Sequence, residues 1–144
     1  MNKKFRTYTY KDMSDLTMQI YHQVQNSKFV PDLIVGLSRG GLVPAVELSH
    51  LFDIPLKVID VTTREKFTKQ YIFDLDYCSG KKALVVDDVC DSGVTLKLIQ
   101  PHFPKDSDVR FACCFNKINE NDFDLDYCGE EITDNRWITF PWEP

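Results

Sequence analysis

The sequence has little positive charge and no long apolar run. It contains 17 lysines and arginines against 22 aspartates and glutamates, which gives a net charge of −5. A broad basic face for nucleic acid is therefore not expected, and a polyanionic ligand must be held by local groups. No apolar run is long enough to span a membrane, and no N-terminal segment is typical of a signal peptide. We expect a cytoplasmic protein without a transmembrane segment.

Disulfides and zinc sites are not indicated either. The five cysteines are odd in number and show no CxxC or His/Cys zinc spacing. Cys113 and Cys114 lie in an apolar run, so we expect them to be buried thiols. This cysteine usage favours a reducing compartment.

The chain is long enough for one domain with its own core. Of its 144 residues, 43% are hydrophobic and 12% aromatic, which is typical of a globular protein. No repeat or second domain is visible, so we predict a single domain over residues 1–144.

The most informative stretch is residues 82–96. Its apolar run, 83–86, is typical of a strand buried on both faces of a parallel sheet. The run stops at two adjacent acids, Asp87 and Asp88. A short Asp-Ser-Gly-Val-Thr turn, 91–95, then leads into helix-forming residues.

This turn has the groups of a phosphate socket. The N–H groups that begin a helix, the hydroxyls of Ser92 and Thr95 and the flexible Gly93 can together surround a phosphate. The carboxyl end of a strand is also where open α/β sheets bind ligands. Acids beside such a socket indicate a ligand with hydroxyls and phosphate, assisted by a divalent metal.

An ordinary strand-to-helix turn is the alternative, with Asp91 or Ser92 as the helix N-cap. For each turn residue taken singly, this alternative stays open. It does not explain Asp87 and Asp88, whose mutual repulsion needs compensation.

Another apolar run, 33–37, also ends in polar residues. Gly40 and Gly41 allow the backbone to approach a ligand closely, and the guanidinium of Arg39 suits a phosphate. A glycine turn with a surface arginine is the alternative.

Two more predicted strands, 56–61 and 109–115, are followed by basic residues. Residues 62–70 lose apolar periodicity and form either an exposed hairpin or loop, or a mobile lid that excludes water. Lys117 stands just past the later strand, where a lysine is by default exposed.

In the N-terminal part, apolar and polar residues alternate over 5–10, which is compatible with an edge strand, and one helix is predicted after it. Thr9 and Asp12 have the spacing of a capping box. Apolar residues then recur from 13 to 24 at spacings of three and four, which predicts a helix that packs one stripe on the sheet.

Three segments together resemble the type I phosphoribosyltransferases. Residues 83–95 match that family's phosphoribosyl-pyrophosphate signature: apolar residues, two acids, two variable residues, then Asp-Thr/Ser-Gly-x-Thr. Residues 38–44 (SRGGLVP) resemble the pyrophosphate loop of the bacterial xanthine-guanine (hypoxanthine) branch. The tail 137–142 (Trp-Ile-x-x-Pro-Trp) is similar to the tail of the same branch.

The resemblance implies an α/β fold: a mainly parallel, twisted sheet flanked by helices. It also implies a flexible lid at about 62–72 and a small hood from the N-terminal and C-terminal segments. The implied activity is Mg²⁺-dependent transfer of the 5-phosphoribosyl group from phosphoribosyl pyrophosphate to a 6-oxo purine (guanine, xanthine or hypoxanthine). The products would be a nucleoside monophosphate and pyrophosphate, as in purine salvage, and a homodimer or homotetramer would be expected.

The family's site residues carry over by position. Those implied to bind phosphoribosyl pyrophosphate are Arg39, Gly40, Lys69, Asp87, Asp88, Asp91, Ser92, Gly93, Val94 and Thr95. Those implied to bind the base are Asp91, Lys117, Trp137 and Ile138.

Within this set, the resemblance gives some residues particular roles. Asp87, Asp88 and Asp91 would be catalytic, with Asp88 on the metal and Asp91 as general base at the purine N7. Lys117 would donate to the C6 oxygen, while Trp137 would stack on the base. Trp142 would be structural.

Two other functions are possible. The lid lacks the Ser-Tyr pair of many relatives and has Thr62-Thr63, which gives some weight to a regulator that binds the sugar donor or a nucleotide without turnover. A phosphotransfer domain with an acidic pocket also uses clustered aspartates, but it would not predict the glycine loop or the tryptophan tail.

Overall fold

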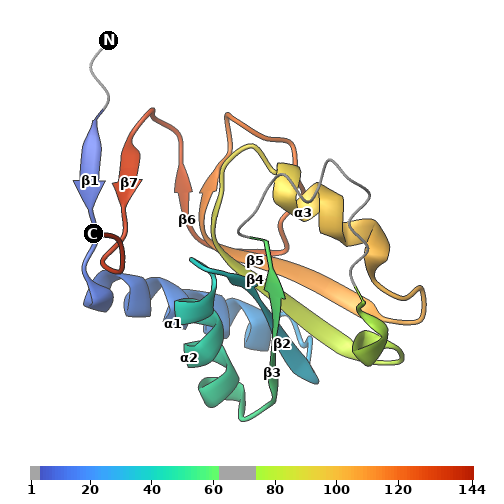
Figure 1. Ribbon diagram of the computed structural model, residues 1–144. Helices are drawn as coiled ribbons and strands as arrows, with labels where there is room; N and C mark the ends of the chain where they lie inside the picture. The colour runs from blue at the N-terminus through green and yellow to red at the C-terminus, as the bar shows by residue number, and fades with distance from the viewer. Residues whose placement is uncertain (1–3, 62–73) are drawn as a thin grey trace.

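A five-stranded parallel sheet is the centre of the computed structural model, which describes residues 4–61 and 74–144 (Figure 1). Its strand order is β3-β2-β4-β5-β6, and every neighbouring pair is parallel. The sheet strands are β2 (Leu33–Ser38), β3 (Leu56–Asp60), β4 (Lys82–Cys90), β5 (Asp108–Lys117) and β6 (Tyr127–Ile132). The helices are α1 (Tyr10–Asn26), α2 (Leu42–Phe52) and α3 (Val94–Ile99), with short 3₁₀ turns η2 (Asp76–Cys78) and η3 (Gln100–His102).

Helices cover both faces of the sheet. On one face α1 and α2 pack on a core that includes Leu84 and Val86, whereas α3 packs on the opposite face with Val85 and Phe111. Neighbouring residues of β4 thus enter opposite cores, as expected for a strand buried on both sides. This arrangement confirms the predicted α/β class.

The predicted start of α1 is confirmed in detail. The Thr9 hydroxyl accepts from the Asp12 N–H at 3.0 Å, and the Asp12 carboxylate accepts from the Thr9 N–H at 2.8 Å. Along the helix, the buried residues are Met13, Leu16, Thr17, Ile20 and Val24. The apolar stripe therefore fixes α1 on the sheet.

The two ends of the chain form a separate small sheet, here called the hood. Strand β1 (Phe5–Thr7) pairs in parallel with β7 (Trp137–Thr139), so that Phe5 lies opposite Trp137 (Figure 1). The predicted N-terminal edge strand thus lies in the hood and not in the main sheet.

Two features of the sheet were not predicted from the sequence. Strand β4 does not stop at the acids but continues to Cys90, because β5 still pairs with it there. Strand β6 was not expected, since the sequence around Gly129, Glu130 and Glu131 lacks a buried apolar run.

The predicted lid at 62–72, including Thr62, Thr63 and Lys69, lies outside the described residues. Within the described ranges, no helix combines the length and apolarity needed to cross a membrane.

Candidate active site

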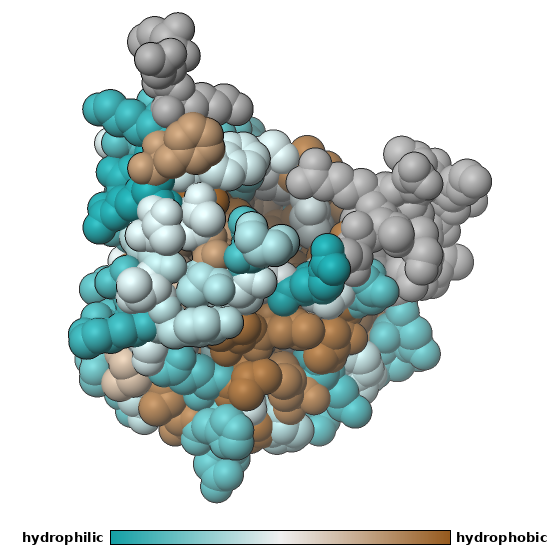
Figure 2. Space-filling view, turned by 60° about the vertical axis from the view of Figure 1, so that its left-hand side comes forward, coloured by the Kyte–Doolittle hydropathy of each residue, from teal (hydrophilic) through white to brown (hydrophobic). Residues whose placement is uncertain are grey.

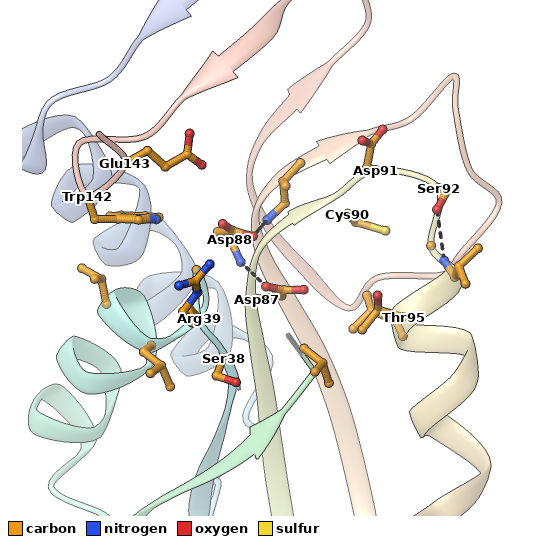
Figure 3. A pocket seen from close by; sticks show the side chains of 18 of the residues that line it. Ser38, Arg39, Asp87, Asp88, Cys90, Asp91, Ser92, Thr95, Trp142 and Glu143 are labelled. Atoms are coloured by element: carbon orange, nitrogen blue, oxygen red, sulfur yellow. Dashed lines mark hydrogen bonds between the residues drawn. The ribbon is translucent and has the colours of Figure 1, made fainter. Parts of the chain in front are cut away.

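A cavity of about 720 Å³ opens where the carboxyl ends of β2 and β4 separate (Figure 3). These strands are neighbours, but their pairing stops at Gly36 and Val86. The chain continues from β2 to β3 on one side and from β4 to β5 on the other, so the cavity lies at a topological switch point, the usual ligand site of open α/β sheets. Its lining residues are Ser38, Arg39, Gly40, Leu42, Val43, Val61, Asp87, Asp88, Val89, Cys90, Asp91, Ser92, Gly93, Val94, Thr95, Leu96, Trp142, Glu143 and Pro144.

The glycine loop forms one wall of the cavity. The Ser38–Arg39 peptide bond is cis, and Arg39 reaches the cavity with an exposed side chain. A Cβ built on Gly40 would overlap the carboxylate of Asp88. The loop therefore approaches β4 as closely as glycine alone allows.

Asp87 and Asp88 form the floor. Each carboxylate accepts from the next backbone N–H: Asp88 N–H donates to Asp87 Oδ1 at 2.8 Å, and Val89 N–H donates to Asp88 Oδ1 at 2.7 Å. Burial raises the pKa of Asp87, and the neighbouring Asp88 raises it further. Burial likewise raises the pKa of Asp88, with a smaller contribution from Glu143. Such a pair gains most from a bound cation or from hydroxyl donors.

The Asp91–Thr95 turn forms the wall opposite the glycine loop (Figure 3). The N-cap of α3 is Gly93, whose φ of 79° is left-handed, and no side chain caps the helix. The alternative of Asp91 or Ser92 as N-cap is therefore wrong. Ser92 Oγ accepts only a long 3.4 Å bond from the Val94 N–H.

Lys117, Asp91 and Trp137 meet beside this wall. Lys117 is 9% exposed, and its Nζ lies 3.6 Å from Asp91 Oδ1 and 5.7 Å from the centre of the Trp137 ring. The Trp137 side chain is 47% exposed, while Ile138 is buried in the core on the α1 and α2 face of the sheet. The structure thus brings together an acceptor, a donor and an aromatic face that are far apart in the sequence.

Arg136 links the hood to the sheet, a role that no sequence pattern indicated. Its Nη1 group donates to Tyr8 Oη and to Glu130 Oε2, each at 3.1 Å. Its Nε and Nη2 groups donate to Asp134 at 3.1 and 3.0 Å. An arginine held by two carboxylates and a phenol fixes the start of β7, where Trp137 follows directly.

The residues after β7 also line the cavity. Trp142 stacks on Phe140 with ring centres 4.8 Å apart, which agrees with a packing role. It borders the cavity as well, together with Glu143 (Figure 3). No sequence signal marked Glu143, because its place depends on how the tail folds back.

The carboxylates of the site suit a hard cation that takes its remaining ligands from water and substrate. In residues 4–61 and 74–144, no group of three or more histidines, cysteines and acids could hold a metal ion. The Asp87–Asp88 pair offers carboxylate oxygens only. Mg²⁺ fits such a site, since it binds through one or two carboxylates and takes its remaining oxygens from water and substrate.

Comparison with known proteins places this geometry in one family. The model of the phosphoribosyl transferase domain matches residues 8–144. Xanthine-guanine phosphoribosyltransferase of Cereibacter sphaeroides is 30% identical over 119 residues, which cover 76% of this chain and 68% of that protein.

Solved structures agree. The crystal structure of a purine phosphoribosyltransferase from Pyrococcus horikoshii is similar over 100% of this chain and 95% of its own, with a TM-score of 0.76 and 31% identity. Xanthine-guanine-hypoxanthine phosphoribosyltransferase of Helicobacter pylori has a TM-score of 0.79 over 98% of this chain and 93% of its own. At 22% identity, that second likeness concerns the fold alone.

Proposed function

The chain belongs to the phosphoribosyl transferase domain family, and we propose that it transfers the 5-phosphoribosyl group of phosphoribosyl pyrophosphate to a 6-oxo purine. The acceptor is guanine, xanthine or hypoxanthine, and the products are a nucleoside monophosphate and pyrophosphate. The curated relative named above and the Pyrococcus horikoshii structure support a purine acceptor.

The observation that carries the proposal is the meeting of Asp91, Lys117 and Trp137. N7 and O6 are neighbours on one edge of a 6-oxo purine, so a carboxylate and an ammonium 3.6 Å apart match an N7–H donor and an O6 acceptor. The exposed ring of Trp137 offers a stacking surface for the base. Adenine has an amino group at C6, which would oppose the donors of Lys117.

The donor lies in the cavity between the glycine loop and the Asp91–Thr95 turn. The 5′-phosphate binds the turn, through Ser92, Gly93, Val94 and Thr95. Arg39 and the backbone at Gly40 bind the pyrophosphate, and Asp87 and Asp88 bind the ribose hydroxyls. We add Lys69 to the donor contacts on the family resemblance alone.

Mg²⁺ belongs in this proposal because the acid pair suits it. Asp88 would hold the ion, directly or through water, and the donor would supply further oxygens. When bound, Mg²⁺ neutralises charge on the departing pyrophosphate.

The chemical step moves one proton and one glycosyl bond. The N9 lone pair of the purine forms a bond to C1′ of the ribose as the C1′–oxygen bond breaks, and the bonding electrons leave with the pyrophosphate. Asp91 accepts the N7 proton as general base. In this step, positioning and electrostatics matter more than a covalent nucleophile, because charge grows on the departing pyrophosphate.

The proposal extends to organisation and location. We propose one domain over residues 1–144, in which the hood carries Trp137 and Ile138; the lid at about 62–72, outside the described residues, is proposed on the family resemblance alone. All five cysteines are free, in accord with a cytoplasmic protein.

Self-association is proposed through α2 and β3. The exposed valines Val43, Val46 and Val58 lie on these two elements, and Figure 2 shows a hydrophobic area on the same side of the molecule. An apolar surface of this kind commonly marks a contact between protein chains.

Product identification tests the function. The protein, phosphoribosyl pyrophosphate, Mg²⁺ and guanine are incubated, and guanosine 5′-monophosphate is sought by chromatography and mass. Its formation by the native protein, with loss in Asp91→Asn, supports the proposal. Donor binding without any nucleotide product would instead favour the regulator.

A further inference from the structure

Asn121 lies in the connection between β5 and β6 and contacts the backbone of both Asp91 and Lys117, whose side chains pair with each other. Its Nδ2 donates to the Lys117 carbonyl at 2.8 Å and to the Asp91 carbonyl at 2.9 Å. Longer contacts run to Asn116 Oδ1 at 3.1 Å and to the Cys90 carbonyl at 3.2 Å. Because an amide nitrogen carries two hydrogens, these four acceptors share them.

The orientation of this amide is fixed. Its Oδ1 accepts from the Phe123 N–H at 3.0 Å, so that Nδ2 faces the two carbonyls. A Cβ at Gly93 would lie 3.5 Å from Cβ of Asn121, which places Asn121 directly against the proposed phosphate turn.

Backbone pairing between β4 and β5 ends just before this point. The last pair is Cys90 with Asn116, one residue short of Asp91 and Lys117. Beyond it, the Asn121 side chain links the two backbones where the strand ladder no longer does. The link therefore fixes the relative position of two residues whose side chains have to meet one edge of a base.

We propose that Asn121 is a positioning residue that sets the spacing of Asp91 and Lys117 and so couples the phosphate turn to the base contact. This inference rests on the proposed function. Asn121 is not among the residues that line the cavity. It holds the two carbonyls so that one carboxylate and one ammonium present themselves together to N7 and O6. Because a misplacement of about 1 Å can cost about 100-fold in rate, such a link matters to turnover.

Asn119 provides a matched control. It is the same residue type in the same connection, and its Nδ2 donates to the Thr133 carbonyl at 2.9 Å, at an exposed position. A change there tests whether loosening this connection alone affects the site.

The experiment compares Asn121→Ala and Asn121→Asp with Asn119→Ala. Asn121→Asp keeps the shape and an acceptor for Phe123 but faces the carbonyls with an acceptor. Affinities are measured by calorimetry for ribose 5-phosphate, which uses the phosphate turn, and for guanosine 5′-monophosphate, which uses both parts. For the Asn121 variants we expect about a 10-fold loss with the nucleotide and less than about a 2-fold loss with the sugar phosphate. Asn119→Ala should change neither.

A double-mutant cycle adds a readout that a purely structural role would not move. In a Lys117→Met background, Asn121→Ala should cost little further nucleotide affinity, because the pair it aligns is already broken. Any one of four results would overturn the inference. These are equal losses of affinity for both ligands, equal losses in Asn119→Ala, an additive double-mutant cycle, and failure of both Asn121 variants to fold. If the native protein binds the nucleotide but forms none, the proposed function fails while the Asn121 comparison still decides. If it binds neither ligand, both fail.

Discussion

The carboxylate of Asp88 fills the space that a side chain at position 40 would need, since a Cβ on Gly40 would overlap it. The two residues belong to different strand ends, one in the loop after β2 and one in β4. Their contact brings the proposed pyrophosphate loop against the acid proposed to hold the metal.

Gly40→Ala is therefore expected to displace Asp88 or the loop. We predict about a 10- to 100-fold loss of affinity for phosphoribosyl pyrophosphate in Mg²⁺, measured by calorimetry. The control is Gly80→Asn, at a remote turn where φ is 71° and the nearest atom lies 4.0 Å from an added Cβ. Unchanged donor affinity in Gly40→Ala would show that the contact has no part in donor binding.

Asp91→Asn removes the proposed general base and keeps the shape of the side chain. We predict a fall in kcat of about 100- to 10,000-fold, with donor affinity retained, because base catalysis commonly contributes that much. Fixed-time assays with guanine measure the rate. The control is Asp122→Asn, which changes an exposed acid that pairs with Lys97. Native turnover in Asp91→Asn would remove this residue from the mechanism.

Arg136→Met should loosen the start of β7 and so move Trp137. We expect KM for the purine to rise several-fold while KM for the donor stays the same, since the arginine's bonds run to Tyr8, Glu130 and Asp134, none of which lines the cavity. Arg110→Met is the matched control. This arginine also donates to a tyrosine, Tyr127 at 2.9 Å, but it lies near the start of β5, whereas Lys117 ends that strand. A parallel rise of both KM values, or the same rise in Arg110→Met, would contradict the proposed role.

Val46→Lys tests the association surface. Val46 is 43% exposed on α2, and a lysine there would place charge in an apolar contact. We predict a shift towards monomer by light scattering after gel filtration, whereas Val30→Lys, at a 69% exposed site between α1 and β2, should leave the mass unchanged. A native protein that is already monomeric would remove the association proposal.

The sequence predicted what depends on local pattern. The capping box at Thr9 and Asp12, the stripe of α1 and the buried strands each follow from periodicity or from fixed spacings, and all are confirmed. The meeting of Lys117, Asp91 and Trp137 is not a local property. It was reached through the family resemblance, and the structure supplies the distances.

The errors have physical causes. Gly93 takes the N-cap position because the turn needs a left-handed residue there, so side-chain capping preferences did not apply. Strand β6 was missed because it is an edge strand with Glu130 and Glu131 in it, and pairing with β5 sustains it. Asn121, Glu143 and Arg136 gave no signal because their places in the site depend on contacts between separate parts of the chain, such as Arg136 with Tyr8 and Asn121 with Asp91.

The most direct test is pyrophosphate release from phosphoribosyl pyrophosphate with Mg²⁺, run separately with guanine, xanthine, hypoxanthine and adenine. The account predicts release with at least one 6-oxo purine, little or none with adenine, and loss of release when a chelator removes the metal. Release with adenine alone would contradict the role of Lys117. No release with any of the four bases, by a protein that binds the donor, would contradict the proposed activity.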